Sequence, residues 1–314
     1  PDAFVSNLLL EHLRLFNNSL HRIPAPALQP LVNLRWLDMS NNLYRSAALD
    51  GVFAFSWLNT TELWCDMALD KSAAALPAML RDLRGKPLDY LRFRNLFEFT
   101  YYVGDTDPFA GLAELQITQL VFYRGKFNEN LLRLALLNVQ RSRVRDLALV
   151  AIDFDISNPD VLRFDWTFTW LSGVAALSII NVNFNYVPCD AWGEMRNVEA
   201  LDISGNRLED GYIYNQRCHY QGVMPKLESF VLATNQLLSL AVHNRVTAGT
   251  FGCLPTTLEY LDLSYSQLDR LDMDYFTQSP RLRELRLSGN KIKFIPSEWR
   301  CPRLEVLAID GNSF

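Results

Sequence analysis

The sequence predicts an α/β fold: a horseshoe-shaped solenoid of about twelve leucine-rich repeats, with a parallel β-sheet on its concave face and an irregular convex side that carries short helices. The first observation is a recurring frame, L-x-x-L-x-L-x-x-N-x-L, at the spacing of roughly 20–29 residues that is typical of this architecture. Clear copies of the frame begin at Leu10, Leu34, Val198, Leu227, Leu258, Leu282 and Leu304.

The second observation is that the frame continues through the middle of the chain without its asparagine. Degenerate copies, with apolar residues at nearly all of the first, fourth and sixth positions, begin at Thr60, Leu88, Ile117, Val144 and Val174. Apolar residues that alternate in this way predict a half-buried strand. We therefore expect the leucines to point into the solenoid and the residues between them to line the concave face.

The ninth position of the frame is where the chain turns from strand into loop. An asparagine there can bond to backbone groups of its own coil and of the neighbouring coil, and such a ladder would hold the coils in register. The ninth-position residues, in chain order, are Asn18, Asn42, Ala68, Leu96, Gly125, Ile152, Val182, Asn206, Asn235, Ser266, Asn290 and Asn312. Five consecutive repeats lack the ladder. Neutral drift would explain scattered losses, so the unbroken run favours an architectural cause, with altered curvature in the middle.

The ladder divides the predicted solenoid into three blocks: residues 1–59 with the asparagines, 60–197 without them, and 198–314 with them again. Extra residues in the central block predict short convex helices, one in the segment that starts at Ser72 and one in the segment that starts at Asn128. Because neither end of the chain shows a capping unit, we interpret the sequence as a fragment of a longer chain.

Composition excludes several classes of function. The net charge of −5, with both signs interspersed, disfavours nucleic-acid binding, which needs a basic stripe. The sequence contains no apolar stretch of about 18 residues, so it predicts no transmembrane helix. The sequence carries no hydrolase, metalloprotease or nucleotide-binding signature, so we expect no enzyme activity, no metal site and no cofactor.

The cysteines and the sequons favour an oxidising, extracellular compartment. Cys189 and Cys218 lie in neighbouring repeats that would stack, so a disulfide between them would join adjacent coils. We expect Cys65 to be a small buried hydrophobe. Two N-glycosylation sequons occur, at Asn17 and Asn59.

One convex connection is unusually rich in aromatic and apolar residues. Its pocket candidates are Phe154, Ile156, Leu162, Phe164 and Phe168, with Phe184 and Tyr186 in the next repeat. These side chains would fill the solenoid core or line a small-molecule pocket between two coils that lack ladder bonds. A second apolar feature is predicted on the concave face, where the outward positions of the middle coils are Val121, Tyr123, Ala148, Val150, Ser178 and Ile180.

The order of the three blocks resembles the ectodomains of Toll-like receptors of the lipopeptide-sensing subfamily. The segment from Val182 to Leu240 is especially similar, with its V-P-C turn at 187–189, its frame from Val198, its second cysteine Cys218 and its P-x-L start at Pro225. The resemblance implies a disulfide between Cys189 and Cys218. It also implies an acyl-chain pocket in the region between Phe154 and Tyr186.

The resemblance further implies a pattern-recognition receptor of innate immunity, with this chain on the extracellular side of a single-pass membrane protein at the cell surface or in the endosome. Its partners would be a lipidic or lipopeptide microbial ligand and a related ectodomain, in a homodimer or heterodimer that signals. The membrane span and the signalling domain would lie outside this sequence. The alternative is an interaction scaffold or receptor that binds a protein partner on its surface, without a small-molecule pocket.

Overall fold

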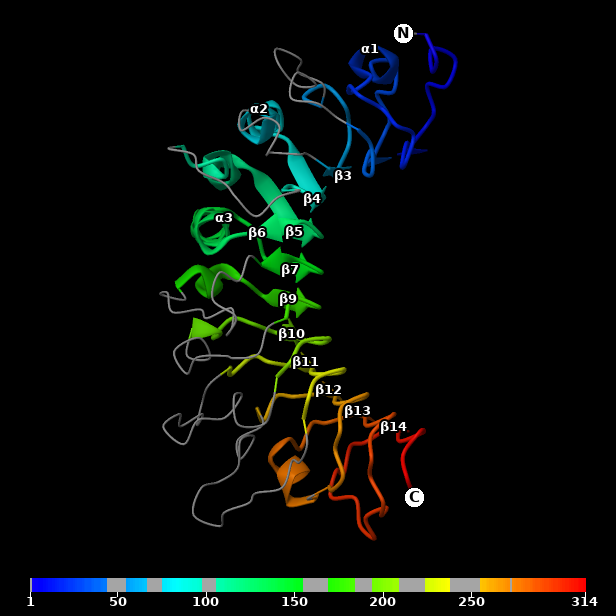
Figure 1. Ribbon diagram of the computed structural model, residues 1–314, viewed down its shortest axis with the longest axis vertical. Coiled ribbons are helices and arrows are strands. Elements are labelled where there is room, and N and C mark those ends of the chain that lie inside the picture. Colours follow the sequence, from blue (N-terminus) through cyan, green and yellow to red (C-terminus); the bar gives the residue numbers. More distant parts are fainter. Residues whose placement is uncertain are drawn as a thin grey trace. The chain divides into compact units, whose positions relative to one another are not determined.

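The computed structural model describes residues 2–43, 55–66, 75–97, 106–154, 169–183, 194–208, 224–237, 255–271 and 273–314. The chain forms two compact units, Pro1–Asp155 (unit 1) and Ile156–Phe314 (unit 2). In each unit, parallel strands follow one another in chain order (Figure 1). This stacking confirms the predicted leucine-rich-repeat solenoid.

A strand lies in each of the twelve copies of the frame. The strands of unit 1 are β1 (His12–Arg14), β2 (Trp36–Asp38), β3 (Glu62–Asp66), β4 (Pro87–Arg94), β5 (Gln116–Tyr123) and β7 (Asp146–Val150). Those of unit 2 are β9 (Ala176–Ile180), β10 (Ala200–Asp202), β11 (Ser229–Val231), β12 (Tyr260–Asp262), β13 (Glu284–Arg286) and β14 (Val306–Ala308).

The strand register confirms the frame, including its degenerate copies. In unit 1 the fourth-position residues pair in one column: Leu13, Leu37, Leu63, Leu91, Leu120 and Leu147. In unit 2 the same column is Leu177, Leu201, Phe230, Leu261, Leu285 and Leu307. Away from the first and last coils these side chains are at most 1% exposed, and burying each one contributes about 2 kcal/mol.

The helices lie behind the strands, on the side of the sheet predicted to be convex (Figure 1). In unit 1 they are α1 (Ala25–Leu28), α2 (Ala75–Asp82), the 3₁₀ helix η2 (Ala110–Glu114) and α3 (Glu129–Arg141); unit 2 has the 3₁₀ helices η3 (Thr169–Gly173) and η4 (Met273–Gln278). The Asn128 side chain caps α3 by accepting a hydrogen bond from Leu131 N at 2.9 Å, as predicted. The other predicted helix is α2, and Ser72 lies outside the described residues.

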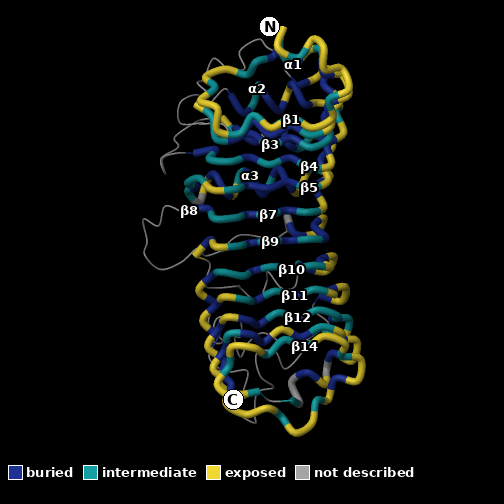
Figure 2. The backbone as a smooth tube through the Cα atoms, turned by 90° about the vertical axis from the view of Figure 1, so that its right-hand side faces the viewer, coloured by how far each residue is buried: buried dark blue, intermediate teal, exposed yellow. Residues whose placement is uncertain are grey.

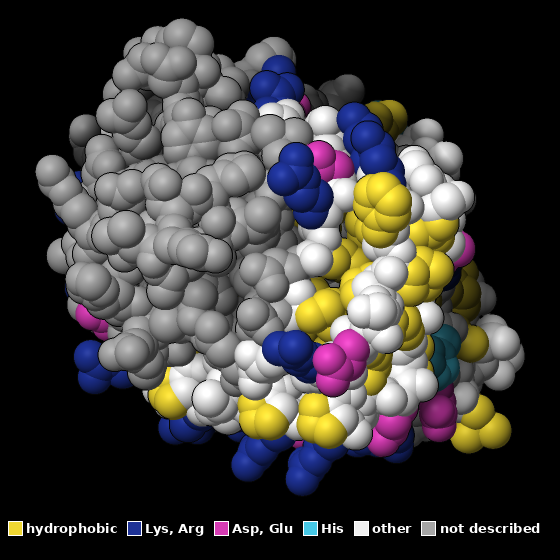
Figure 3. Space-filling model, turned by 90° about the horizontal axis from the view of Figure 1, so that it is seen from below, with side chains coloured by type: hydrophobic (Ala, Val, Ile, Leu, Met, Phe, Trp, Pro, Cys, Tyr) yellow, Lys and Arg dark blue, Asp and Glu magenta, His cyan; other side chains and the backbone are white. Residues whose placement is uncertain are grey.

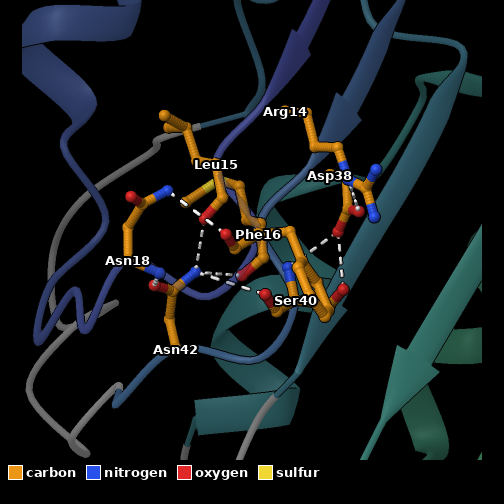
Figure 4. Close-up of polar contacts among 8 residues, drawn as sticks. Arg14, Leu15, Phe16, Asn18, Asp38, Ser40 and Asn42 are labelled. Carbon is orange, nitrogen blue, oxygen red and sulfur yellow. Dashed lines mark hydrogen bonds and ion pairs between the residues drawn. The ribbon is translucent and has the colours of Figure 1, made fainter.

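The asparagine ladder forms where the sequence predicts it. Asn42 Oδ1 accepts hydrogen bonds from the N–H groups of Asn18 and Leu20, and its Nδ2 donates to Leu15 O and Met39 O at 2.9 Å (Figure 4). Equivalent bonds to the preceding coil and to their own coil are made by Asn206, Asn235, Asn290 and Asn312. Each of these side chains therefore joins two coils.

The coils without asparagine hold together in a different way. Leu96, Ile152 and Val182 occupy the ladder position and are at most 2% exposed, so a hydrophobe fills the space of the amide. At Gly125 the backbone takes over: Asp153 N donates to Gly125 O at 2.9 Å, beside a small parallel sheet of β6 (Lys126–Phe127) and β8 (Asp153–Phe154). Whether these coils also change the curvature stays a prediction.

The residue before the ladder position takes the left-handed backbone conformation in each coil where that residue is described, with φ between 50° and 67°. This conformation turns the chain out of the strand, and it favours glycine and asparagine. The residues are Asn17, Asn41, Asn95, Arg124, Ala151, Asn181, Gly205, Thr234, Tyr265, Gly289 and Gly311. Exposed residues gather at the turns between coils, whereas the strands from β2 to β12 are mostly buried or half-buried (Figure 2).

Exposed hydrophobic side chains lie at the C-terminal end of unit 2. Hydrophobic side chains gather on this end of unit 2 (Figure 3), where Phe294 is 82% exposed and Val306 and Phe314 are also exposed. Among the described residues, no helix has the length and the apolar character needed to cross a bilayer.

Candidate ligand-binding surface

Most of the residues predicted to form the pocket and the disulfide lie outside the described residues. This holds for Ile156, Leu162, Phe164, Phe168, Phe184, Tyr186, Cys189 and Cys218. Of the pocket candidates, only Phe154 has a described backbone, in β8. The pocket and the disulfide therefore stay predictions.

The apolar patch predicted on the concave face needs one correction. Val121 was expected to point to solvent, but it is buried, with 6% of its surface exposed. Its registered neighbour on β4 is Arg92, whose guanidinium lies 5.0 Å from the Tyr123 ring. The long Arg92 side chain thus extends toward the strand that carries Val121. Ala148 and Val150 on β7 are half-buried.

In unit 1, a row of aromatic side chains crosses the concave face of the sheet from β1 to β4. The His12 and Trp36 rings are 6.1 Å apart, Trp36 meets Trp64 edge-on at 5.4 Å, and Trp64 lies 5.7 Å from Tyr90. Three of these residues occupy the third position of the frame and Trp64 the fifth. Because the strands hold successive coils in register, side chains about 25 residues apart in sequence form one continuous surface.

Arg92 lies between two rings of this surface. Its guanidinium carbon is 3.9 Å from the centre of the Trp64 ring and 5.0 Å from that of Tyr123. These are cation–π distances, so the rings fix the position of the charge. Burial raises the pKa of Tyr90, while the charge of Arg92 and its hydrogen bond to the phenol act in the opposite direction.

A second arginine cluster surrounds Phe16. Arg14 and Arg94 lie 5.1 Å and 5.7 Å from the Phe16 ring, although Arg94 belongs to the coil of β4 and Phe16 to that of β1. Arg14 also lies 3.5 Å from the buried Asp38 carboxylate, which accepts hydrogen bonds from Ser40 N and Ser40 Oγ (Figure 4). The Asp38 charge is therefore engaged within the first two coils. We call Phe16, Trp36, Trp64, Tyr90, Arg92 and Arg94 the arginine–aromatic surface.

Several donors on this surface have no acceptor. Trp64 Nε1, Arg92 Nε, and Arg94 Nε and Nη1 are buried atoms without a hydrogen-bond partner in the part of the chain that the structure describes. Within the same part, neither Arg92 nor Arg94 forms an ion pair. Buried polar groups in folded proteins are almost always bonded, so this group of unpaired donors is unusual.

Sequence reasoning missed this surface. The signal was available, because His12, Trp36 and Tyr90 share the third frame position, two residues after each opening apolar residue. Reading the sequence by frame position across repeats would have placed these rings in one column. No pattern in the sequence indicates that Arg94 contacts Phe16, which lies three coils earlier. The direction of the Arg94 side chain is set by its packing against neighbouring coils.

The remaining candidate residues have simple environments. Cys65 is buried, as predicted, and its thiol donates to Arg92 O at 3.8 Å. Burial raises the pKa of the Cys301 thiol, which takes no part in a disulfide. The sequon residues Asn17 and Asn59 are exposed. Within the described ranges, no three His, Cys, Asp or Glu side chains are grouped so that they could hold a metal ion.

Comparisons with known proteins agree with this architecture. The leucine-rich-repeat family matches residues 256–314. Toll-like receptor 2 of Mus musculus is 26% identical over 185 aligned residues, which cover 46% of this chain and 23% of the receptor. Toll-like receptor 2 of Homo sapiens is also 26% identical, over 45% of this chain and 22% of the receptor. The matches thus span under a quarter of the length of these curated relatives.

Solved structures share the fold across nearly the whole chain. The mouse RP105/MD-1 complex contains a chain with a TM-score of 0.58 and 16% identity, covering 97% of this chain and 51% of that one. An internalin from Listeria monocytogenes has a TM-score of 0.53 and 14% identity, covering 96% of this chain and 81% of its own. The protein therefore has the leucine-rich-repeat fold and resembles Toll-like receptor ectodomains in sequence.

Proposed function

We propose that this chain is a ligand-binding part of the ectodomain of an innate immune pattern-recognition receptor. The ligand is a microbial lipid or lipopeptide, and signalling follows dimerisation with the same or a related ectodomain. The observation that carries the proposal is the similarity to Toll-like receptor 2 over 46% of the chain, on a solenoid whose repeats all keep the frame. We assign the chain no enzyme activity, no cofactor and no nucleic-acid ligand.

The proposed lipid site is the apolar segment around Phe164 and Phe184, where two coils lack the side-chain ladder. Apolar pockets with few polar groups are the usual sites for such ligands. The proposal includes a disulfide between Cys189 and Cys218, glycans on the exposed Asn17 and Asn59, and the three-block division of the solenoid at residues 59/60 and 197/198. It also places the chain on the extracellular side of a single-pass membrane receptor, at the cell surface or in the endosome.

A charge placed in the segment tests the site. Phe164→Glu and Phe184→Glu should each weaken binding of a synthetic dipalmitoylated cysteinyl peptide by tenfold or more, on the order of 1.4 kcal/mol, because a carboxylate would be buried against acyl chains. Phe294→Glu is the matched control, since Phe294 is 82% exposed and should tolerate the charge. Unchanged binding in both test variants would refute the proposed site.

The second candidate function is recognition of a protein partner without a small-molecule pocket. The half-buried aromatic and arginine side chains of the arginine–aromatic surface favour it, because such residues are enriched at protein interfaces. Val150→Arg separates the two functions: it alters the outer face of the sheet and should weaken protein binding while leaving lipopeptide binding intact. Val121 is unsuitable for this test because it is buried.

A further inference from the structure

The arginine–aromatic surface of unit 1 combines three properties. Trp36, Trp64 and Tyr90 form a row of neighbouring rings, Arg92 lies against Trp64, and the half-buried Arg94 lies beside the Phe16 ring. We propose that this surface is a docking site for a partner protein segment whose carboxylate side chains alternate with apolar or aromatic ones. The proposal is independent of the lipidic ligand.

The donors define what the partner must supply. The guanidinium groups of the half-buried Arg92 and Arg94 carry only donors, so a partner that binds them must supply acceptors. A carboxylate matches one edge of a planar guanidinium with two parallel hydrogen bonds, as Glu305 does with Nε and Nη2 of Arg283 in unit 2.

The stacking around Arg92 defines how binding gains specificity. Its guanidinium lies 3.9 Å from Trp64 and 5.0 Å from Tyr123, so its orientation is fixed before the partner arrives. A preorganised side chain loses little conformational entropy on binding. Neither Arg92 nor Arg94 has an ion pair among the described residues.

A protein segment fits this surface better than a polyanion does. Nucleic acids and sulfated glycans carry closely spaced charges, and the carboxylates of Asp38 on β2 and Glu62 on β3 lie on strands next to the arginines. Trp, Tyr and Arg are the residue types that dominate binding energy at protein interfaces. The rings would hold apolar side chains of the segment, and the guanidinium groups would hold its carboxylates.

The test uses random dodecamer peptides displayed on phage and selected on the full chain. We expect the selected peptides to carry Asp or Glu beside apolar or aromatic residues. For the synthetic form of the best peptide, fluorescence anisotropy should show that Arg94→Gln weakens binding about thirtyfold. Arg286→Gln, on β13 of unit 2, is the matched control and should change the affinity less than twofold.

Two further measurements keep the result decisive. Arg92→Lys retains the charge but loses the planar stacking, so it should also weaken binding, and thermal unfolding of each variant shows whether it is folded. Heparin and poly(U) serve as polyanion probes. Selected peptides without acidic residues, no selected peptide, or binding insensitive to Arg94→Gln and Arg92→Lys would overturn the proposal. Heparin or poly(U) binding more tightly than the peptide, with the same sensitivity, would identify a polyanion site instead.

Discussion

The guanidinium of Arg92 lies against the face of the Trp64 indole, 3.9 Å from the ring centre, and hydrogen-bonds to the Tyr90 phenol. The two residues come from adjacent coils and were brought together by the register of β3 with β4. This contact joins the aromatic row to the arginines. Its effect can be measured through the pKa of Tyr90.

The first prediction concerns the pKa of Tyr90. Burial raises this pKa, and Arg92 holds it down by its charge and its hydrogen bond. Arg92→Gln should therefore raise the pKa of Tyr90 further, which NMR of ¹³C-labelled tyrosine rings would follow in alkaline titration. Tyr260 is the control, because its pKa is influenced by Arg286 in unit 2 and should not respond. An unchanged Tyr90 titration would show that Arg92 does not interact with the phenol.

The second prediction concerns the ladder. Asn235 is 5% exposed, accepts from Leu208 N and donates to Ile203 O and Leu232 O. Asn235→Ala would leave these buried backbone groups unpaired, so the free energy of unfolding should fall by about 3 kcal/mol in urea denaturation. Asn18→Ala is the matched control: Asn18 is exposed and should change stability by about 0.5 kcal/mol or less. Equal losses in the two variants would contradict a structural role for the ladder.

The third prediction is a stabilising substitution. Ser266 holds the ladder position of its coil, is buried, and its hydroxyl has no hydrogen-bond partner in the described part of the chain. The coils on both sides accommodate Asn235 and Asn290, so Ser266→Asn should complete the ladder and raise the free energy of unfolding by about 1 kcal/mol. Ser313→Asn, at an exposed site of the last coil, should have little effect. A loss of stability in Ser266→Asn would mean that the coil is too tight for the amide.

The fourth prediction concerns pH. Asp82 at the end of α2 is buried, and its Oδ2 accepts from Phe55 N at 2.6 Å. Burial raises its pKa above the ordinary value of 3.8, so the folded chain binds the proton more tightly than the unfolded chain. The stability contribution of Asp82 must then fall as the pH rises from about 3.8 through the raised pKa.

Asp82→Asn cannot ionise, yet its side-chain oxygen can still accept from Phe55 N. The variant should match the natural chain below this pH window and become more stable than it above the window, in urea denaturation across the pH range. Parallel stability curves for the two proteins would exclude a raised pKa for Asp82.

Much of the fold followed from the sequence because one frame repeats. Even where the ladder residue is Leu96 or Ile152, the buried leucines at Leu91 and Leu147 keep the strands in the predicted register. Asn128 identified the start of α3 because capping is a local interaction. These features depend on residues that are close in sequence or share a frame position.

The candidate surface was harder to predict because its contacts join different coils. Phe16 and Arg94 are 78 positions apart, and their meeting depends on how each side chain leans across the sheet. We expected Val121 to be exposed to solvent, but it is buried. Its frame position does not reveal how far the side chain of the neighbouring Arg92 extends. The predicted pocket around Phe164 lies outside the described residues, so its test is experimental.

The measurement that tests the proposed receptor function most directly is extraction of the purified protein with organic solvent, followed by mass spectrometry of the extract. The account predicts a stoichiometric acyl lipid, because an open apolar pocket would retain one through purification. A clean extract, together with an added dipalmitoylated peptide that fails to raise the melting temperature, would contradict the lipid site. That result would leave the arginine–aromatic surface of unit 1 as the recognition site of the chain.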